Sequence, residues 1–184
     1  VKAMKILMIV GSMRKESFNM QLAREAEKLL EGKAEVSFLS YGDIPYMNQD
    51  IEYPAPESIA RVRAEAQSAD GLWIFTPEYN HSFPGVLKNL LDWLSRPLVE
   101  GNRAAGTAVS GKKAAISGAA GKSAAAFARA QLRELLGFMG VSVLEEETGA
   151  TLGAEAFMSG KLSLSGEELS RLRKQAEAFT DLLS

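Results

Sequence analysis

The chain has 184 residues, of which 46% are hydrophobic and 24% are charged, and its formal net charge is −2. This composition is typical of one folded domain over residues 1–184, and it excludes a disordered chain, a collagen and a coiled coil. The chain has no cysteine and one histidine. Disulfides, thiol nucleophiles and iron–sulfur clusters are therefore excluded, and we expect no metal site.

The charge balance and the hydropathy also limit the partners of the chain. Its 21 basic and 23 acidic residues form no basic excess of the kind that binds nucleic acid or anionic membranes. The apolar run at residues 6–10 is too short to span a bilayer or to act as a signal peptide. We therefore expect a cytoplasmic protein that binds neither nucleic acid nor membranes.

The first half of the chain alternates between strand and helix patterns. Residues 5–10 are almost wholly apolar, which is typical of a strand buried on both faces of a parallel sheet. A helix follows, with an apolar stripe from Leu22 to Leu30. Residues 34–40 predict a second strand, and a helix begins near Pro56 after a loop with three prolines.

Residues 71–76 predict a third strand, because they are apolar and rich in aromatic and β-branched side chains. The helix that follows Pro84-Gly85 carries six large apolar residues in nine positions. Packing against one sheet would cover only part of so wide an apolar stripe. We therefore expect the rest of the helix to contact a second subunit.

The remaining elements continue the alternation. Residues 113–117 predict a fourth strand, residues 123–139 a helix with Phe127 among its inward-facing side chains, and residues 141–144 a fifth strand. A capping box of Ser165 and Glu168 opens a last helix. Five strands separated by helices predict an α/β fold, a doubly wound sandwich with a five-stranded parallel sheet. Ligands of such folds bind beyond the carboxyl ends of the strands.

The loop after the first strand, residues 11–19, has the polar side chains that a phosphate group needs. Ser12, Ser17 and Asn19 supply hydroxyl or amide donors, Arg14 supplies a charged donor fork, and the helix N-terminus supplies free N–H groups. The loop matches neither the P-loop nor the Rossmann pattern, which favours a terminal phosphomonoester. In the alternative interpretation, Ser17 only caps the helix and Arg14 is a solvated surface charge.

The loop after the third strand, residues 76–85, is stiffened by two prolines. A rigid loop with free N–H groups and the aromatic Tyr79 could receive the edge and the face of a planar heteroaromatic ring. In the alternative interpretation, it is an ordinary connection in which Tyr79 packs against the protein.

Two motifs summarise these loops: Gly11-Ser12-x-Arg14-x-x-Ser17-x-Asn19 and Pro77-Glu78-Tyr79-Asn80-His81-Ser82-x-Pro84-Gly85-x-Leu87-Lys88-Asn89-x-x-Asp92-Trp93. Together they closely resemble the NAD(P)H-dependent FMN reductase family, which includes quinone, chromate and azo-dye reductases. The resemblance runs from Lys5 to about Leu144. It implies a flavodoxin-like fold with sheet order 2-1-3-4-5, bound FMN, and a homodimer or homotetramer.

The resemblance also implies which residues bind FMN. Those assigned to the phosphate are Ser12, Arg14, Ser17, Phe18 (through its N–H) and Asn19. Those assigned to the isoalloxazine ring are Pro77, Glu78, Tyr79 and Asn80. Ser117 and Gly118 fall where the family has a third flavin-contacting loop, but residues 119–122 depart from the family's proline-containing, diglycine-rich stretch.

By the same resemblance, NADPH or NADH delivers hydride to the flavin, and a small electron acceptor, such as a quinone or free flavin, then takes two electrons at the same face. The hydride chemistry belongs to the flavin, so we assign no catalytic side chain. We interpret His81 as a loop residue, and Lys88 with Asp92 as an ordinary helical ion pair. Three other functions stay open: a flavodoxin-type electron carrier, a non-catalytic flavin-binding protein, and a hydrolase that uses Ser12 or Ser17.

Overall fold

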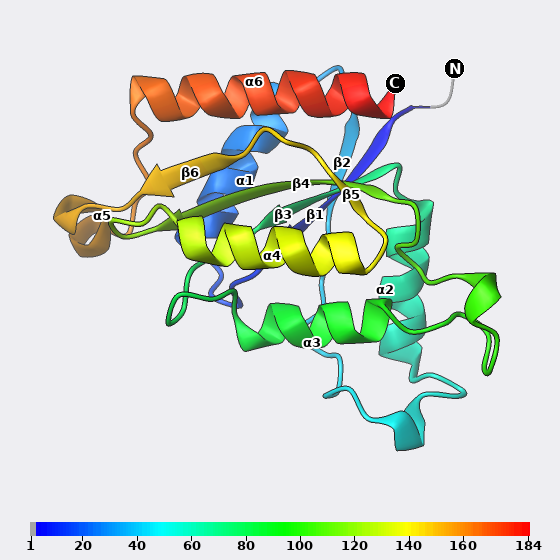
Figure 1. Cartoon of the computed structure of the whole chain (residues 1–184). Coiled ribbons are helices and arrows are strands. Elements are labelled where there is room, and N and C mark those ends of the chain that lie inside the picture. Colours follow the sequence, from blue (N-terminus) through cyan, green and yellow to red (C-terminus); the bar gives the residue numbers. More distant parts are fainter. Residues whose placement is uncertain (1–2) are drawn as a thin grey trace.

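A parallel β-sheet runs through the centre of the computed structural model, which describes residues 3–184 (Figure 1). The strands lie in the order β2-β1-β3-β4-β5, and β6 also pairs with β4. Their bounds are β1 (Lys5–Val10), β2 (Glu35–Phe38), β3 (Gly71–Phe75), β4 (Lys113–Ala120), β5 (Ser142–Val143) and β6 (Thr148–Thr151). The observed order confirms the flavodoxin-like sheet that the resemblance implies.

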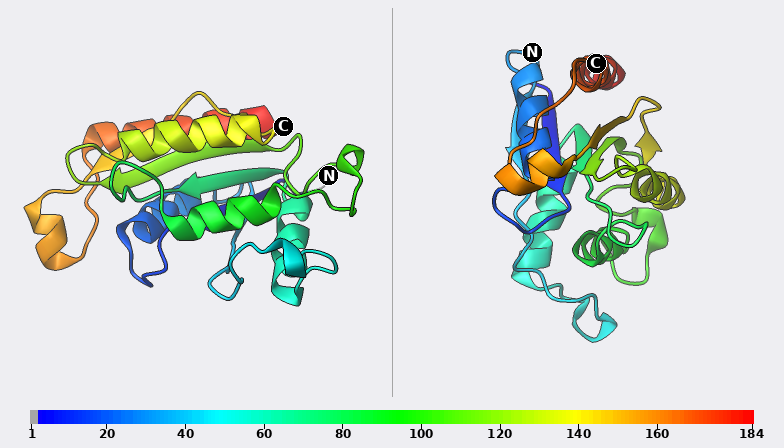
Figure 2. Two further views of the ribbon diagram at one scale, coloured as in Figure 1. Left: turned by 60° about the horizontal axis from the view of Figure 1, so that its bottom comes forward. Right: turned by 90° about the vertical axis from the view of Figure 1, so that its left-hand side faces the viewer.

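Helices cover both faces of this sheet (Figure 2). One face is covered by α1 (Phe18–Leu29) and α6 (Gly166–Leu183), and the other by α2 (Glu57–Ser68), α3 (Gly85–Leu94) and α4 (Ala126–Phe138). The connections contain a short helix, α5 (Ala154–Ser159), and two 3-10 turns, Gln49–Ile51 and Arg103–Ala105. Within residues 3–184, no helix is both long enough and apolar enough to cross a membrane.

The central strands divide their side chains between two cores. Along β1, Ile6 and Met8 pack with α1 and α6, whereas Leu7 and Ile9 pack with the helices of the opposite face. Because both faces are covered, nearly every position of these strands is apolar, as the sequence predicts. The capping box of α6 is also confirmed, since the backbone N–H of Glu168 bonds the Ser165 hydroxyl and the Ser165 N–H bonds the Glu168 carboxylate.

The last part of the sheet differs from the prediction. The strand β4 continues three residues beyond Ser117, and β5 is reduced to two residues. The chain then leaves the sheet and returns as β6, which pairs with the second half of β4. Glu147, in the connection, forms ion pairs with Arg129 and Arg133, and these contacts attach the connection to α4.

The apolar residues of α3 are buried within the chain itself. Five of the six, Leu87, Leu90, Leu91, Trp93 and Leu94, lie in the core shared with α2 and the sheet, and Val86 alone among the six is exposed. The apolar stripe of α3 is therefore buried by contacts within one chain and does not require a second subunit. Phe127 was predicted to face inward, and this prediction is wrong, because its ring is half exposed and stacks on His81.

Candidate functional site

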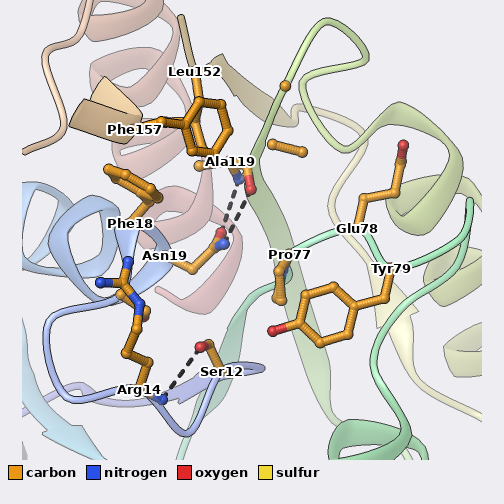
Figure 3. A pocket seen from close by; sticks show the side chains of 13 residues that line it. Ser12, Arg14, Phe18, Asn19, Pro77, Glu78, Tyr79, Ala119, Leu152 and Phe157 are labelled. Carbon is orange, nitrogen blue, oxygen red and sulfur yellow. Dashed lines mark hydrogen bonds between the residues drawn. The ribbon is translucent and has the colours of Figure 1, made fainter. Parts of the chain in front are cut away.

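A pocket opens at the carboxyl edge of the sheet, where the segments after β1, β3 and β4 meet (Figure 3). Its volume is about 200 Å³. Its lining residues are Ser12, Arg14, Ser17, Phe18, Asn19, Pro77, Glu78, Tyr79, Ala119, Ala120, Gly121, Leu152 and Phe157. Eight of these thirteen are residues that the sequence proposes for the site.

The β1–α1 loop forms the polar end of the pocket. Ser17 caps α1, since its buried hydroxyl oxygen accepts the Met20 N–H at 3.0 Å, and its own hydrogen stays available to a ligand. Ser12 accepts the N–H of Arg14 at 3.3 Å. The first N–H groups of an α-helix have no partner within the helix, which leaves those of Phe18 and Asn19 available.

Arg14 brings a positive charge to this end of the pocket. Its guanidinium lies over the ring of Phe18, 5.3 Å from the ring centroid. Across residues 3–184, no carboxylate forms an ion pair with it. A cation without a counter-charge, next to hydroxyl groups and a helix N-terminus, is the arrangement that binds phosphate.

Asn19 joins two walls of the pocket. Its buried side chain donates to the Ala119 carbonyl at 3.1 Å and accepts the Ala119 N–H at 2.8 Å. The amide thus connects the N-terminus of α1 directly to β4, and Figure 3 shows this pair of bonds at the back of the pocket. Asn19 therefore sets the distance between the walls, and one hydrogen of its NH₂ group is left for a ligand.

A tight turn shapes the loop after β3. Tyr79 and Ser82 exchange backbone hydrogen bonds of 2.8 and 3.1 Å, and the two residues between them, Asn80 and His81, have φ values of 53° and 61°. This is the geometry of a type I′ turn, which asparagine tolerates but which costs energy in histidine. Asn80 lies at the exposed tip and does not line the pocket.

Contacts with α4 hold this turn in place. The ring of His81 stacks on Phe127 with 4.2 Å between centroids, and the amide of Gln131 bonds both the His81 carbonyl and the Ser82 hydroxyl. These contacts agree with a structural role for His81. Tyr79 lines the pocket with a half-exposed ring.

Glu78 connects the same loop to the start of α4. Its carboxylate accepts the Ser123 hydroxyl at 2.6 Å and the Ala128 N–H at 3.0 Å. It thus caps a helix that has no side-chain cap of its own, because the residue at that position is Ala125. Burial alone would raise the pKa of Glu78, but hydrogen bonds from Ser123, Ala128 and Phe127 outweigh burial and lower it below its usual value.

The third predicted contact loop is displaced along the chain. Ser117 lies in the middle of β4, with its buried hydroxyl accepting from Trp73 and donating to Gln175. Gly118 lies so close to Thr76 that an added Cβ would be 2.5 Å from its carbonyl oxygen. Neither residue lines the pocket, and Ala119, Ala120 and Gly121 take their place.

No sequence pattern predicts two of the residues that line the pocket. Leu152 follows β6 and Phe157 belongs to α5, and neither element was predicted. The described residues also contain no group of three or more His, Asp or Glu side chains that could hold a metal ion.

The sequence model of the NADPH-dependent FMN reductase family matches residues 4–154. The chain belongs to this family. A quinone reductase from Pseudomonas putida is 34% identical over 181 residues, which cover 96% of this chain and 90% of that protein. A 2-hydroxy-1,4-benzoquinone reductase from a Burkholderia species is 46% identical over 95 residues, and the match spans about half of each chain (52%).

Solved structures agree with this assignment. The flavoenzyme FerB from Paracoccus denitrificans, an NAD(P)H:(acceptor) oxidoreductase, superposes with a TM-score of 0.83 at 33% identity, covering 98% of this chain and 97% of that one. Flavodoxin 1 from Bacillus cereus superposes with a TM-score of 0.62 at 17% identity, covering 98% of this chain and 99% of that one. The second likeness shows the shared fold alone.

The lowered pKa of Glu78 predicts a pH-dependent contribution to stability. The ionised carboxylate stabilises the fold above the pKa of glutamate in the unfolded chain, and this stabilisation is lost as the pH falls through the lower pKa of the folded state. We expect Glu78→Gln to reduce the free energy of unfolding by about 1 kcal/mol at neutral pH, as for other helix caps, and to have a much smaller effect at about pH 3.

Urea denaturation at the two pH values measures this difference. Glu134→Gln is the matched control, because Glu134 is an exposed residue of α4, the helix that Glu78 caps. An equal loss of stability at both pH values would show that the charge of Glu78 does not contribute.

Proposed function

We propose that the chain is an FMN-dependent oxidoreductase that uses NADPH or NADH to reduce quinones, free flavin or similar small acceptors. One observation carries the proposal: in a chain of this family, two loops line a single pocket. They are residues 11–19 after β1, which we call the phosphate-type loop because of its donors and its cation, and the rigid loop of residues 76–85 after β3. The names of the relatives, a quinone reductase and an NAD(P)H:(acceptor) oxidoreductase, support the same reaction class.

The residues of the pocket fit FMN. Arg14, the hydroxyls of Ser12 and Ser17 and the first turn of α1 suit a phosphate group, since they combine positive charge with donors. The opposite part has the flat side chains of Pro77 and Tyr79. It also has the small residues 119–121, which let a planar ring approach the backbone closely. We propose that Asn80, Ser117 and Gly118 act on this site indirectly, through the turn and strand that hold it.

When bound, FMN supplies the hydride chemistry, and the chain supplies binding and orientation. Glu78 is the one carboxylate that lines the described pocket, and its oxygens are engaged by Ser123 and Ala128. His81 does not line the pocket. We therefore assign no catalytic acid or base. Among residues 3–184, no histidine or carboxylate is hydrogen-bonded to the Ser12 or Ser17 hydroxyl, as a hydrolase would need.

A second groove adjoins the pocket at Tyr79, which lines both. It is formed by residues of the β1–α1 loop, the segment after β2 and the start of α3: Met13, Tyr41, Gly42, Ile44, Pro45, Tyr46, Tyr79, Pro84, Gly85, Val86 and Asn89. Its mostly apolar lining suits an aromatic electron acceptor. We propose that part of the nicotinamide substrate or the acceptor binds there.

Turnover tests the proposed function. The chain loaded with FMN is mixed with NADPH or NADH and a benzoquinone, and oxidation of the nicotinamide is followed by absorbance. We expect continuous oxidation that requires both FMN and the quinone. Binding of FMN without turnover would favour an electron carrier, and failure to take up FMN would favour a protein that has lost the flavin.

Arg14→Ala tests the phosphate end of the site. A charge-assisted hydrogen bond is worth about 1.5–3 kcal/mol, so we expect FMN affinity to fall roughly 10- to 150-fold. Titration of the apoprotein, followed by quenching of FMN fluorescence, measures the affinity. Lys15→Ala is the matched control, because Lys15 is a cation of the same loop that does not line the pocket. An unchanged affinity for Arg14→Ala would place Arg14 away from the phosphate.

We also propose that the chain forms a homodimer or homotetramer in the cytoplasm. The apolar side chains that the fold leaves exposed on α3 and α4 support the assembly: Val86 is 42% exposed and Phe138 is 92% exposed. These two helices are neighbours on one face of the molecule (Figure 1). Val86 lies at the start of α3 and Phe138 at the end of α4, so a partner chain that covers both would contact these helices along their whole length. The absence of cysteine agrees with a reducing compartment.

Phe138→Glu tests the assembly. A carboxylate at this position would have to be desolvated in an interface. We therefore expect the variant to shift the equilibrium from the dimer or tetramer toward the monomer. Light scattering coupled to size-exclusion chromatography measures the molar mass. Leu182→Glu, on α6 of the opposite face, is the control. A wild-type mass of a single chain would contradict the proposal.

A further inference from the structure

The helix α5 brings an aromatic side chain to the pocket from outside the segment that defines the family. The family match ends at residue 154, where α5 begins, and Phe157 lies beyond it. The helix projects at the carboxyl edge of the sheet, beside the N-terminus of α1 (Figure 2). Its contribution to the pocket is therefore a feature of this chain that the family match does not describe.

Phe157 belongs to a series of three side chains at the polar end of the pocket. Its ring packs edge-to-face on Phe18, with 5.7 Å between centroids and an interplanar angle of 84°. Phe18 in turn lies under the guanidinium of Arg14 at 5.3 Å. Figure 3 shows the three side chains together on one side of the pocket, opposite Tyr79. The position of Phe157 thus affects the cation that we assign to phosphate.

The segment that carries Phe157 is fastened to α1. The side-chain amide of Gln21 donates to the Gly160 carbonyl at 2.8 Å and accepts the Leu162 N–H at 2.7 Å. These two bonds hold the residues directly after α5. Because Gln21 and Phe18 lie on the same helix, α5 and the phosphate end of the pocket share one support.

Phe157 itself stays open to solvent, since its side chain is 61% exposed although it lines the pocket. Its ring contact among the described residues is the edge-to-face pair with Phe18. We therefore expect Phe157 to act on a ligand through Phe18 and Arg14.

We propose that α5 is a cofactor clamp, in which Phe157 supports Phe18 and thereby holds Arg14 in place for the phosphate of FMN. Phe157 is a positioning residue for Arg14, and the clamp slows release of FMN. This inference rests on the proposed function, since it takes the pocket to be the FMN site.

Comparison of FMN with riboflavin, which lacks the phosphate, tests the clamp. We expect Phe157→Ala to weaken FMN binding about five- to tenfold, mainly through faster release, because it removes an aromatic pair that supports a cation–π contact. Riboflavin affinity should change less than about twofold, since Arg14 has no phosphate to bind there. Fluorescence titration and stopped-flow displacement of the flavin measure affinity and release.

Two further variants complete the experiment. Met158→Ala is the matched control, because Met158 is the next residue of α5, is 82% exposed and does not line the pocket; it should bind both flavins as the wild type does. Gln21→Ala removes the attachment of α5 without changing the pocket lining, and it should weaken FMN more than riboflavin.

The outcomes separate the clamp from the proposed function. If Phe157→Ala binds FMN as tightly as the wild type, the clamp is refuted and the FMN site stands. If FMN and riboflavin lose affinity equally, Phe157 contacts the flavin itself, and the role through Arg14 is refuted. If the wild-type chain binds neither flavin, the proposed function is refuted, and the clamp is refuted with it.

Discussion

The pair of hydrogen bonds between the Asn19 side chain and the backbone of Ala119 is the contact on which the site depends. It joins residues one hundred positions apart and fixes the N-terminus of α1 against the end of β4. Both polar groups of the amide are used in a buried place, where an unpaired group would cost about 1–3 kcal/mol. The phosphate-type loop and the strand that forms the floor of the pocket are thereby held as one unit.

A second connection closes the site from the other side. Glu78 caps α4 from the loop after β3, and Gln131 of α4 holds the turn that follows. The left-handed conformations of Asn80 and His81 persist because these contacts fix the turn at both ends. The pocket is therefore a rigid frame built from three segments, which suits a cofactor whose reactivity depends on orientation.

The sequence predicted the parts of this frame that have local signals. The strands β1 and β3 are continuous apolar runs, and the polar and aromatic side chains of the loops lie where these strands end. Five lining residues follow from that placement: Ser12, Arg14, Ser17, Asn19 and Tyr79. Three more, Phe18, Pro77 and Glu78, follow only from the resemblance to the family. The strand β6 has the sequence Thr-Gly-Ala-Thr, which carries no hydrophobic pattern, and it is a strand because β4 offers an unpaired edge. Leu152 and Phe157 reach the pocket only as a consequence of that pairing. The predicted strand ended at Ser117, and β4 continues to Ala120 because β6 pairs with residues 117–120.

The division of the last strand into β5 and β6 also bears on solubility. A long, unpaired edge of a sheet can pair with another molecule and begin aggregation. Here the edge is broken into segments of two and four residues, separated by a charged connection around Glu147. The opposite edge, β2, is only four residues long. Each edge of the sheet therefore exposes only a few backbone groups with which another chain could pair. The molecule can have a strongly apolar interior without aggregating through its edge strands.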